Sequence, residues 1–237
     1  AVIREVQNER LVARLRSEKA LAESERKATI QASERRAKFF AGANHDLRQP
    51  LQAMGIYLQI LQMQANEANR EIIAQLDATA KNISTLVEQL LEVSRIETGK
   101  LEVKIEDVRI DELFRDLAGE FEPVAAVKGL VFSTRPLEVS VKTDPLLVNR
   151  ILRNLITNAI RYTTKPGAHI VLAARKVGAS RITIGVYDEG PGIERSERKR
   201  IFEAFYRGEA GRASEGGFGL GLSIVAGLAK RLGIGLT

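Results

Sequence analysis

The chain has 237 residues, of which 44% are hydrophobic and 28% charged, a composition that is ordinary for a globular protein of one or two domains. It contains no cysteine and two histidines, His45 and His169, which excludes disulfides and thiolate metal sites and disfavours a histidine-built zinc site. No apolar run approaches the ~20 residues that span a bilayer. We therefore expect this chain to be soluble and cytoplasmic. That expectation is compatible with a membrane anchor elsewhere in the full-length protein.

The first 37 residues are expected to form one long connector helix. Residues 1–38 contain neither glycine nor proline and are rich in Ala, Arg, Glu, Leu and Gln, which favour helix. Much of the chain's formal charge of +6 lies here, with basic and acidic side chains interleaved, a pattern typical of a solvated helix face. The segment 1–37 is compatible with a parallel coiled coil of unassigned register, and we expect no direct contact with nucleic acid.

A helical hairpin is predicted over residues 38–98, because apolar side chains recur in steps of three and four along two rows. The rows comprise Phe40, Leu47, Leu51, Met54, Leu58, Leu61 and Ala65, then Ile72, Ile73, Leu76, Ala80, Ile83, Val87 and Leu90. Further apolar side chains lie outside these rows, at Ile56, Ile60, Leu86 and Leu91. One hairpin buries little surface, so two copies are expected to pair as a four-helix bundle in a homodimer.

A second domain is predicted over residues 99–237. Sixteen of the 19 glycines and five of the six prolines lie beyond residue 100, among short runs of β-forming side chains. Strands are expected at 101–105, 131–134, 140–143, 170–175 and 181–187, and helices at 110–121, 145–161 and 220–232. This order predicts an α+β domain in which helices cover one face of a mixed sheet.

The first candidate site is His45, which is followed by Asp46 and, four residues on, by Gln49. Leu47 and Leu51 face the hairpin seam, so His45 is expected beside the seam and toward water. A neutral imidazole offers a nucleophilic nitrogen, and an adjacent carboxylate can accept the other ring N–H and stabilise the ring as it becomes positive. An isolated His-Asp pair is more often an exposed polar pair without a role. Whether this pair is catalytic therefore depends on the other motifs of the chain.

The second candidate site lies within the helix expected at 145–161. Asn154 and Asn158 are four residues apart, so both amides project from one helical face, where their oxygens can ligate Mg²⁺ together with phosphate oxygens. Arg161 can meet phosphates and Tyr162 can pack on a base. Two such asparagines alone are more often a solvated surface.

Two glycine-rich segments follow. Asp188-Glu-Gly-Pro-Gly192 comes directly after an expected strand, and Gly217-Phe-Gly-Leu-Gly221 directly precedes an expected helix. Glycine lets backbone approach a ligand closely, and a helix N-terminus favours phosphate, so this pairing suggests a nucleotide. Neither segment has the spacing of a P-loop or of a complete dinucleotide fingerprint.

Together with Phe-Glu-Ala-Phe-Tyr-Arg at 202–207, these segments resemble the H, N, G1, F and G2 boxes of sensor histidine kinases, in order and in spacing, over roughly residues 38–237. The resemblance implies a dimerising phosphoacceptor hairpin of the HisKA type, followed by an ATP-binding α/β sandwich of the Bergerat (GHKL) type. It also implies two-component signalling, in which His45 is autophosphorylated from ATP and an aspartate of a response-regulator receiver domain then takes the phosphoryl group. An upstream sensor domain would precede the connector helix.

The resemblance also implies roles for single residues. His45 corresponds to the phosphorylated residue and Asp46 to its acidic partner, while Asn158 corresponds to the principal Mg²⁺ ligand, with Asn154 beside it. Asp188 corresponds to the carboxylate that reads the adenine amino group. The segment 207–215 corresponds to a flexible lid, and the remaining ATP-site residues would be Gly190, Gly192, Arg161, Tyr162, Arg207, Gly217, Gly219, Leu220 and Gly221.

The sequence departs from the family pattern in two places. Gln49 stands where the family usually has Thr or Asn to position water for dephosphorylating the partner, so phosphatase activity stays open. Thr237 falls before the final strands that the family's ATP domain normally has. Two rival interpretations are a gyrase-type or chaperone-type ATPase, which the His45 motif disfavours, and a scaffold that binds ATP without transferring it, which intact Asn158 and Asp188 disfavour.

Overall fold

The computed structural model describes residues 19, 51–63, 67–99, 101–178, 181–208 and 218–236. The predicted connector helix 1–37, apart from one helical residue, lies outside this range, and so do His45, Asp46 and Gln49. Gly217 and most of the expected lid 207–215 also lie outside it. Among the described helices, none is long and apolar enough to cross a bilayer.

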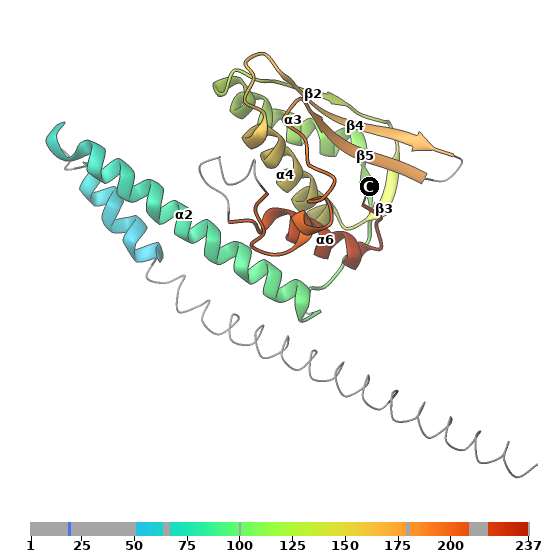
Figure 1. Cartoon of the computed structure of the whole chain (residues 1–237), viewed down its shortest axis with the longest axis horizontal. Coiled ribbons are helices and arrows are strands. Elements are labelled where there is room, and N and C mark those ends of the chain that lie inside the picture. Colours follow the sequence, from blue (N-terminus) through green and yellow to red (C-terminus); the bar gives the residue numbers. More distant parts are fainter. Residues whose placement is uncertain are drawn as a thin grey trace, which may run out of the picture.

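The predicted hairpin is confirmed for the part that the structure describes. Residues 51–63 are helical and run alongside the helix α2 (Glu67–Glu97) (Figure 1). Leu58 on the first helix and Ile73 and Ala80 on the second are buried, as expected for side chains at the seam. Other apolar side chains of the hairpin remain exposed, namely Ile56, Tyr57, Ile60, Leu61, Met63, Ile72, Leu76 and Ile83.

The rest of the chain forms an α/β domain with helices on one face of a mixed sheet, as predicted (Figure 1). Its elements are β1 (Glu106–Arg109), α3 (Ile110–Val127), β2 (Val131–Arg135), β3 (Ser140–Thr143), α4 (Pro145–Tyr162), β4 (His169–Val177), β5 (Arg181–Asp188), a 3-10 turn (Arg200–Phe202) and α6 (Gly221–Leu232). In the three-stranded sheet, β2 runs parallel to β4 and β4 antiparallel to β5. Phe114, Leu117 and Ile156 of the helices pack with Ile170 and Leu172 of β4 in one core.

The predicted strand at 101–105 is wrong, because β1 begins at Glu106, one residue after the predicted strand ends. β1 pairs antiparallel with β3, with Glu106 opposite Thr143. The preceding segment is held differently: Lys104 N donates to Asp144 Oδ2 over 2.7 Å, and Leu101 and Val103 pack beside α6. A hydrogen bond to a side chain replaces the ladder bond that a strand would need, and the alternating apolar pattern reflects packing on a helix.

Helix α4 has a well-defined start that the sequence encodes locally. Asp144 caps it by accepting from Leu147 N over 3.0 Å, and Pro145 occupies the first turn, where no N–H is required. Because Asp144 is buried and also binds Lys104 N, this one carboxylate fixes both the helix and the chain that enters the domain. The positions of the polar side chains further along α4 depend on this anchor.

Helix α3 extends to Val127, six residues beyond the predicted end at 121. Pro123 lies inside it but on the exposed side, so the missing N–H leaves its carbonyl partner facing water rather than core. The helix ends where Gly129 adopts φ +70° and Leu130 N donates back to Ala125 O over 3.0 Å. The glycine, rather than the proline, is therefore the stop signal.

The C-terminal half of α2 packs against α6 of the α/β domain. Leu86, Leu90, Val93 and Ile96 lie against a cluster that includes Leu220, Ile224, Val225 and Leu228. Leu86 was expected to help pair two hairpins, and this expectation is wrong for the described arrangement, since Leu86 packs within its own chain. A Cβ added at Gly227 would lie 2.5 Å from Ile96 Cγ2, so this glycine permits the close approach of the two helices.

A second contact, between Glu92 of α2 and Arg150 of α4, makes the stability of the chain depend on pH. Glu92 Oε1 lies 3.1 Å from Arg150 Nη1 without an aligned hydrogen bond, and the side chain is 11% exposed. Burial raises the pKa of the Glu92 carboxyl above its ordinary value of 4.5, while Arg150 and then Arg95 lower it by less. A raised pKa in the folded state means that the stability from this group is present below about pH 4.5 and is lost as the pH rises through the folded-state value.

Replacing Glu92 with Gln is therefore expected to raise the thermal unfolding midpoint at pH 7 by about 2 °C and to leave it nearly unchanged at pH 4. The amide keeps the shape and removes the cost of burying a charge, while Arg150, whose side chain is half exposed, stays hydrated. Calorimetric scans at the two pH values measure the difference. Glu88→Gln, at an exposed position of the same helix, should show no such pH-dependent gain; a midpoint lowered by E92Q at pH 7 would contradict the argument.

Candidate nucleotide site

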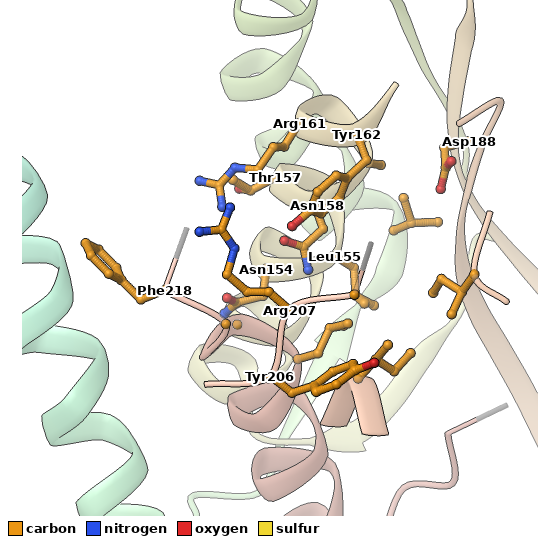
Figure 2. A pocket seen from close by; sticks show the side chains of 18 of the residues that line it. Asn154, Leu155, Thr157, Asn158, Arg161, Tyr162, Asp188, Tyr206, Arg207 and Phe218 are labelled. Carbon is orange, nitrogen blue, oxygen red and sulfur yellow. The ribbon is translucent and has the colours of Figure 1, made fainter. Parts of the chain in front are cut away.

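A cavity of about 530 Å³ lies between α4, the end of β5, the segments on either side of residues 209–217, and α2. Its walls include most of the residues predicted to bind ATP: Asn154, Asn158, Arg161, Tyr162, Asp188, Gly192, Arg207, Gly219 and Gly221. Gly190 and Leu220 lie beside the cavity rather than on its wall, and Leu220 is fully buried in the α6 cluster. Three segments far apart in the sequence thus meet at one hollow (Figure 2).

The two asparagines present oxygen atoms from one face of α4. Asn154 Nδ2 donates to Arg150 O over 3.0 Å, which fixes the amide and leaves its oxygen on the side of α6. A Cβ added at Gly221 would lie 3.0 Å from Asn154 Oδ1, and the Asn158 amide is just beyond it. The amide oxygens and the first turn of α6 therefore form one polar corner.

That corner suits an anion as well as a cation. Helix α6 starts at Gly221 without a side-chain cap, so its first N–H groups remain for another partner. Arg161 and Arg207 point into the same end of the cavity (Figure 2), and guanidinium groups bind phosphate with paired N–H donors. The N-terminus of α6 and the two arginines suit the phosphates of a nucleotide, and the asparagine oxygens suit a metal ion bound to those phosphates.

The opposite end of the cavity is built around Asp188, the last residue of β5 (Figure 2). Asp188 Oδ1 accepts from Gly190 N over 2.9 Å, and a Cβ added at Gly190 would lie 2.7 Å from that oxygen. Thr163 Oγ1 is near the same point and is buried without a hydrogen-bond partner. Asp188 is on the cavity wall, whereas Thr163 lies behind it, and a carboxylate at this end fits a ligand that donates a hydrogen bond, such as the amino group of adenine.

The segment before the undescribed residues 209–217 is tied down by aromatic and ionic contacts. Tyr206 donates from its hydroxyl to Glu197 Oε1 over 2.8 Å, and the Arg200 guanidinium lies 4.4 Å from the Tyr206 ring centroid. Phe205 N donates to Gly219 O over 2.9 Å. The chain therefore leaves and re-enters this site at nearly the same place, which positions Arg207 and Gly219 on the cavity wall.

Sequence reasoning missed one wall of the cavity. Asn82, Thr85 and Gln89 of α2 line it, although they belong to the hairpin rather than to the α/β domain. Their spacing of three and four residues places them on one helical face. This polar face is the feature of the sequence that could have indicated a contact with a polar site. Thr157 and Phe218 also line the cavity and were missed, although each lies next to a motif residue in the sequence.

Comparisons with known proteins match both parts of the chain. Residues 35–99 match the His Kinase A (phospho-acceptor) domain, and residues 143–237 match the family described as histidine kinase-, DNA gyrase B- and HSP90-like ATPase. The chain belongs to the sensor histidine kinases. It is a histidine kinase core in which a phosphoacceptor-type hairpin precedes an ATPase domain.

Individual relatives agree with this placement. The chain is 30% identical over 217 residues to the autoinducer 2 sensor kinase/phosphatase LuxQ of Vibrio vulnificus, which covers 87% of this chain and 25% of that protein. It is 32% identical over 204 residues to the swarming motility regulation sensor protein RssA of Serratia marcescens, covering 85% of this chain and 43% of that protein. The structure of full-length ShkA in complex with AMPPNP aligns with a TM-score of 0.71 and 28% identity, over 83% of this chain and 41% of that one. The kinase core thus spans less than half the length of these relatives.

Gly219 offers a direct test of how the site of this kinase core is built. It adopts φ +71°, and an added Cβ would lie 2.7 Å from Tyr206 O and 2.8 Å from Phe205 C. Gly219→Ala is expected to lower the stability by about 2 kcal/mol and to weaken ADP binding at least tenfold, because the chain on both sides of the cavity must shift. Thermal unfolding and calorimetric titration measure the two effects.

The matched control is Gly178→Ala, which adopts a similar φ of +68° but has open space around the added Cβ. This variant isolates the cost of the backbone conformation, so it should lose about 1 kcal/mol and keep ADP affinity. Equal losses of affinity in the two variants would show that the close contact at Gly219 has no importance for the site.

Proposed function

We propose that this kinase core binds ATP with Mg²⁺ in the cavity, transfers the γ-phosphoryl group to His45 and then passes it to an aspartate of a response-regulator receiver domain. The observation that supports this most is the convergence of Asn154, Asn158, Asp188, Gly219 and Gly221 on one cavity. They come from separate segments whose only common feature is the resemblance to nucleotide-binding boxes. A cavity of about 530 Å³ also suits a molecule of nucleotide size.

In the proposed complex, adenine lies at the Asp188 end and the phosphates at the α6 end. Asp188 would pair with the polar edge of the base, Tyr162 would pack on it, and Gly190 and Gly192 would let the backbone come close. Arg161, Arg207 and the first N–H groups of α6 would hold the phosphate oxygens. Gly217, Gly219 and Gly221 would hinge the lid over them, with Leu220 buried as its anchor.

The metal site would be completed by the substrate. Among the described residues, no group of three or more His, Asp and Glu side chains could hold a metal ion, so a protein-only cage is not available there. Asn158 and Asn154 would supply one or two oxygens, and phosphate and water oxygens the others, which is the way Mg²⁺ is commonly held. When bound, Mg²⁺ neutralises charge on the phosphate chain.

Phosphoryl transfer then needs a nucleophile, which we assign to His45. A ring nitrogen forms a bond to the γ-phosphorus as the bond between that phosphorus and the β,γ-bridging oxygen breaks, and ADP leaves with the electron pair. Asp46 accepts the N–H of the other ring nitrogen and stabilises the positive imidazole. In the second reaction, a carboxylate oxygen of the receiver aspartate displaces the histidine. Gln49 would be placed to orient a water molecule that attacks the aspartyl phosphate of the receiver domain and releases inorganic phosphate, a reaction separate from the transfer.

The assembly that would carry out these reactions is a homodimer. The exposed apolar side chains on the hairpin, Ile56, Ile60, Ile72 and Leu76 among them, support pairing into a four-helix bundle. In this proposal the chain consists of a connector over 1–37, a dimerisation and phosphotransfer hairpin over 38–98 and an ATP-binding domain over 99–237. An upstream sensor domain would act through the connector.

The test is incubation of the chain with Mg²⁺ and γ-labelled ATP, followed by electrophoresis at neutral pH. We expect label on the protein that is lost in acid and kept in alkali, as a phosphoramidate requires, and that moves to an added receiver domain. Release of inorganic phosphate without labelled protein would instead support the ATPase alternative. Binding of ADP without either reaction would support the scaffold alternative.

A further inference from the structure

The cavity has one wall that the nucleotide-binding motifs do not explain. Asn82, Thr85 and Gln89 of α2 line it, and they form a polar stripe on one face of that helix. We call these three residues the α2 stripe. Because α2 belongs to the phosphoacceptor hairpin, the stripe brings part of the hairpin to the mouth of the ATP-binding domain.

The α2 stripe is held in place by its neighbours. The adjacent apolar residues Leu86, Leu90 and Val93 pack beside α6. At the end of the helix, Arg231 Nη2 donates to Gly99 O over 2.6 Å and to Leu101 O over 3.0 Å. The Glu92–Arg150 pair lies one helical turn beyond Gln89. Together these contacts fix the rotation of α2 about its axis and its position along that axis relative to the domain.

Gln89 is the member of the stripe whose side-chain oxygen is not satisfied. Its Oε1 is buried and has no hydrogen-bond partner, whereas Thr85 Oγ1 donates to Lys81 O over 2.9 Å within the helix. A buried amide oxygen that accepts no hydrogen bond is unfavourable by comparison with the same oxygen in water. The side chain is on the cavity wall, so a donor that enters the cavity with a ligand, such as a water molecule bound to it, would satisfy this oxygen.

The stripe faces the phosphate end of the cavity. Arg161, Arg207 and Phe218 are directed toward α2, and Asp188 lies at the far side (Figure 2). A carboxamide placed there meets phosphate oxygens rather than the base. It can offer its N–H₂ group to an anionic oxygen and its oxygen to a water molecule on that oxygen or on the metal ion.

We propose that Gln89 is a positioning residue for the terminal phosphate of the bound nucleotide, and that the α2 stripe forms a subsite which exists when the ATP-binding domain is docked on its own hairpin. This inference rests on the proposed function, since it takes a nucleotide to be the ligand. It adds that the hairpin itself contributes to nucleotide affinity. The docked arrangement thereby holds ATP in preference to nucleotides with fewer phosphates.

The experiment is calorimetric titration of the whole chain with AMPPNP, ADP and AMP, each with Mg²⁺. In Gln89→Leu we expect AMPPNP affinity to fall about tenfold, ADP affinity to fall less and AMP affinity to stay within twofold of the parent. Gln75→Leu is the matched control, because Gln75 is exposed on the same helix and outside the cavity wall. It should leave all three affinities unchanged.

A second variant, Gln89→Glu, separates a contact with phosphate from a packing role. The added negative charge should weaken binding in the order AMPPNP, then ADP, then AMP, while the thermal unfolding midpoint stays within about 2 °C of the parent. Equal losses for the three nucleotides, no loss in either variant, or the same loss in Gln75→Leu would overturn the inference. If the parent chain bound none of them, the proposed function would fall as well, so the two failures are distinguishable.

Discussion

Replacing His45 with Gln is expected to abolish phosphate incorporation from γ-labelled ATP, by about 1,000-fold or more, while ADP affinity stays unchanged. Glutamine keeps a polar side chain of similar length but has no nucleophilic ring nitrogen, and loss of a nucleophile removes the reaction pathway itself. Labelling is measured on neutral gels over a time course, and ADP binding by calorimetry. The separation of the two readouts follows from the chain's organisation, since the cavity is built from residues 82–222.

The natural control is His169, the other histidine of the chain. It starts β4, and its backbone N–H, rather than its ring, binds Glu189 Oε2 over 3.0 Å. His169→Gln should therefore keep the parent's rate of labelling. Residual label in His45→Gln at more than a few percent of the parent, or loss of label in His169→Gln, would show that His45 is not the phosphorylated residue.

The sequence predicts those parts of this fold that depend on local signals. Helix α4 is the clearest case, because Asp144 and Pro145 mark its start within two residues and its apolar period fixes the buried face. The spacing of four residues between Asn154 and Asn158 likewise predicts that both lie on one face of this helix. By contrast, the segment 101–105 has an alternating pattern that is typical of a strand. In the structure it is not a strand, because Lys104 N donates a hydrogen bond to the side chain of Asp144, 40 residues away.

Contacts between the two parts of the chain could not be predicted in this way. Leu90 belongs to the predicted apolar row of the hairpin and Leu86 lies outside it, yet both pack beside α6, because an apolar pattern does not state which partner it meets. Gly227 gives no local hint that Ile96 sits against it. The position of Gln89 on the cavity wall could not be predicted for the same reason. It depends on the contacts of α2 with α6 and α4, and the pattern within each helix does not show which other elements that helix contacts.

Asn158→Ala is expected to lower the labelling rate about 100-fold and to remove the effect of Mg²⁺ on ADP affinity. Asn158 lines the cavity beside Gly221 and Asn154, and we expect Asn154 alone to be too weak a ligand to tie a metal–ADP complex to α4 once the Asn158 oxygen is lost. Catalytic groups that act on developing charge typically contribute 10²–10³ in rate, so a loss of this size is reasonable. ADP titrations with Mg²⁺ and with EDTA measure the metal effect separately from the reaction.

The matched control for this change is Asn149→Ala on the same helix. Asn149 Oδ1 accepts from Arg153 Nε over 2.6 Å and is not part of the cavity wall, so that variant should keep both the rate and the metal effect. Asn158→Asp gives a further distinction, because a carboxylate still ligates Mg²⁺ but repels phosphate. Its ADP affinity should recover with added Mg²⁺, which Asn158→Ala cannot do. If Asn158→Ala bound ADP more tightly with Mg²⁺ than with EDTA, as the parent is expected to do, the metal would have to be held elsewhere and the assignment of α4 as its ligand helix would be lost.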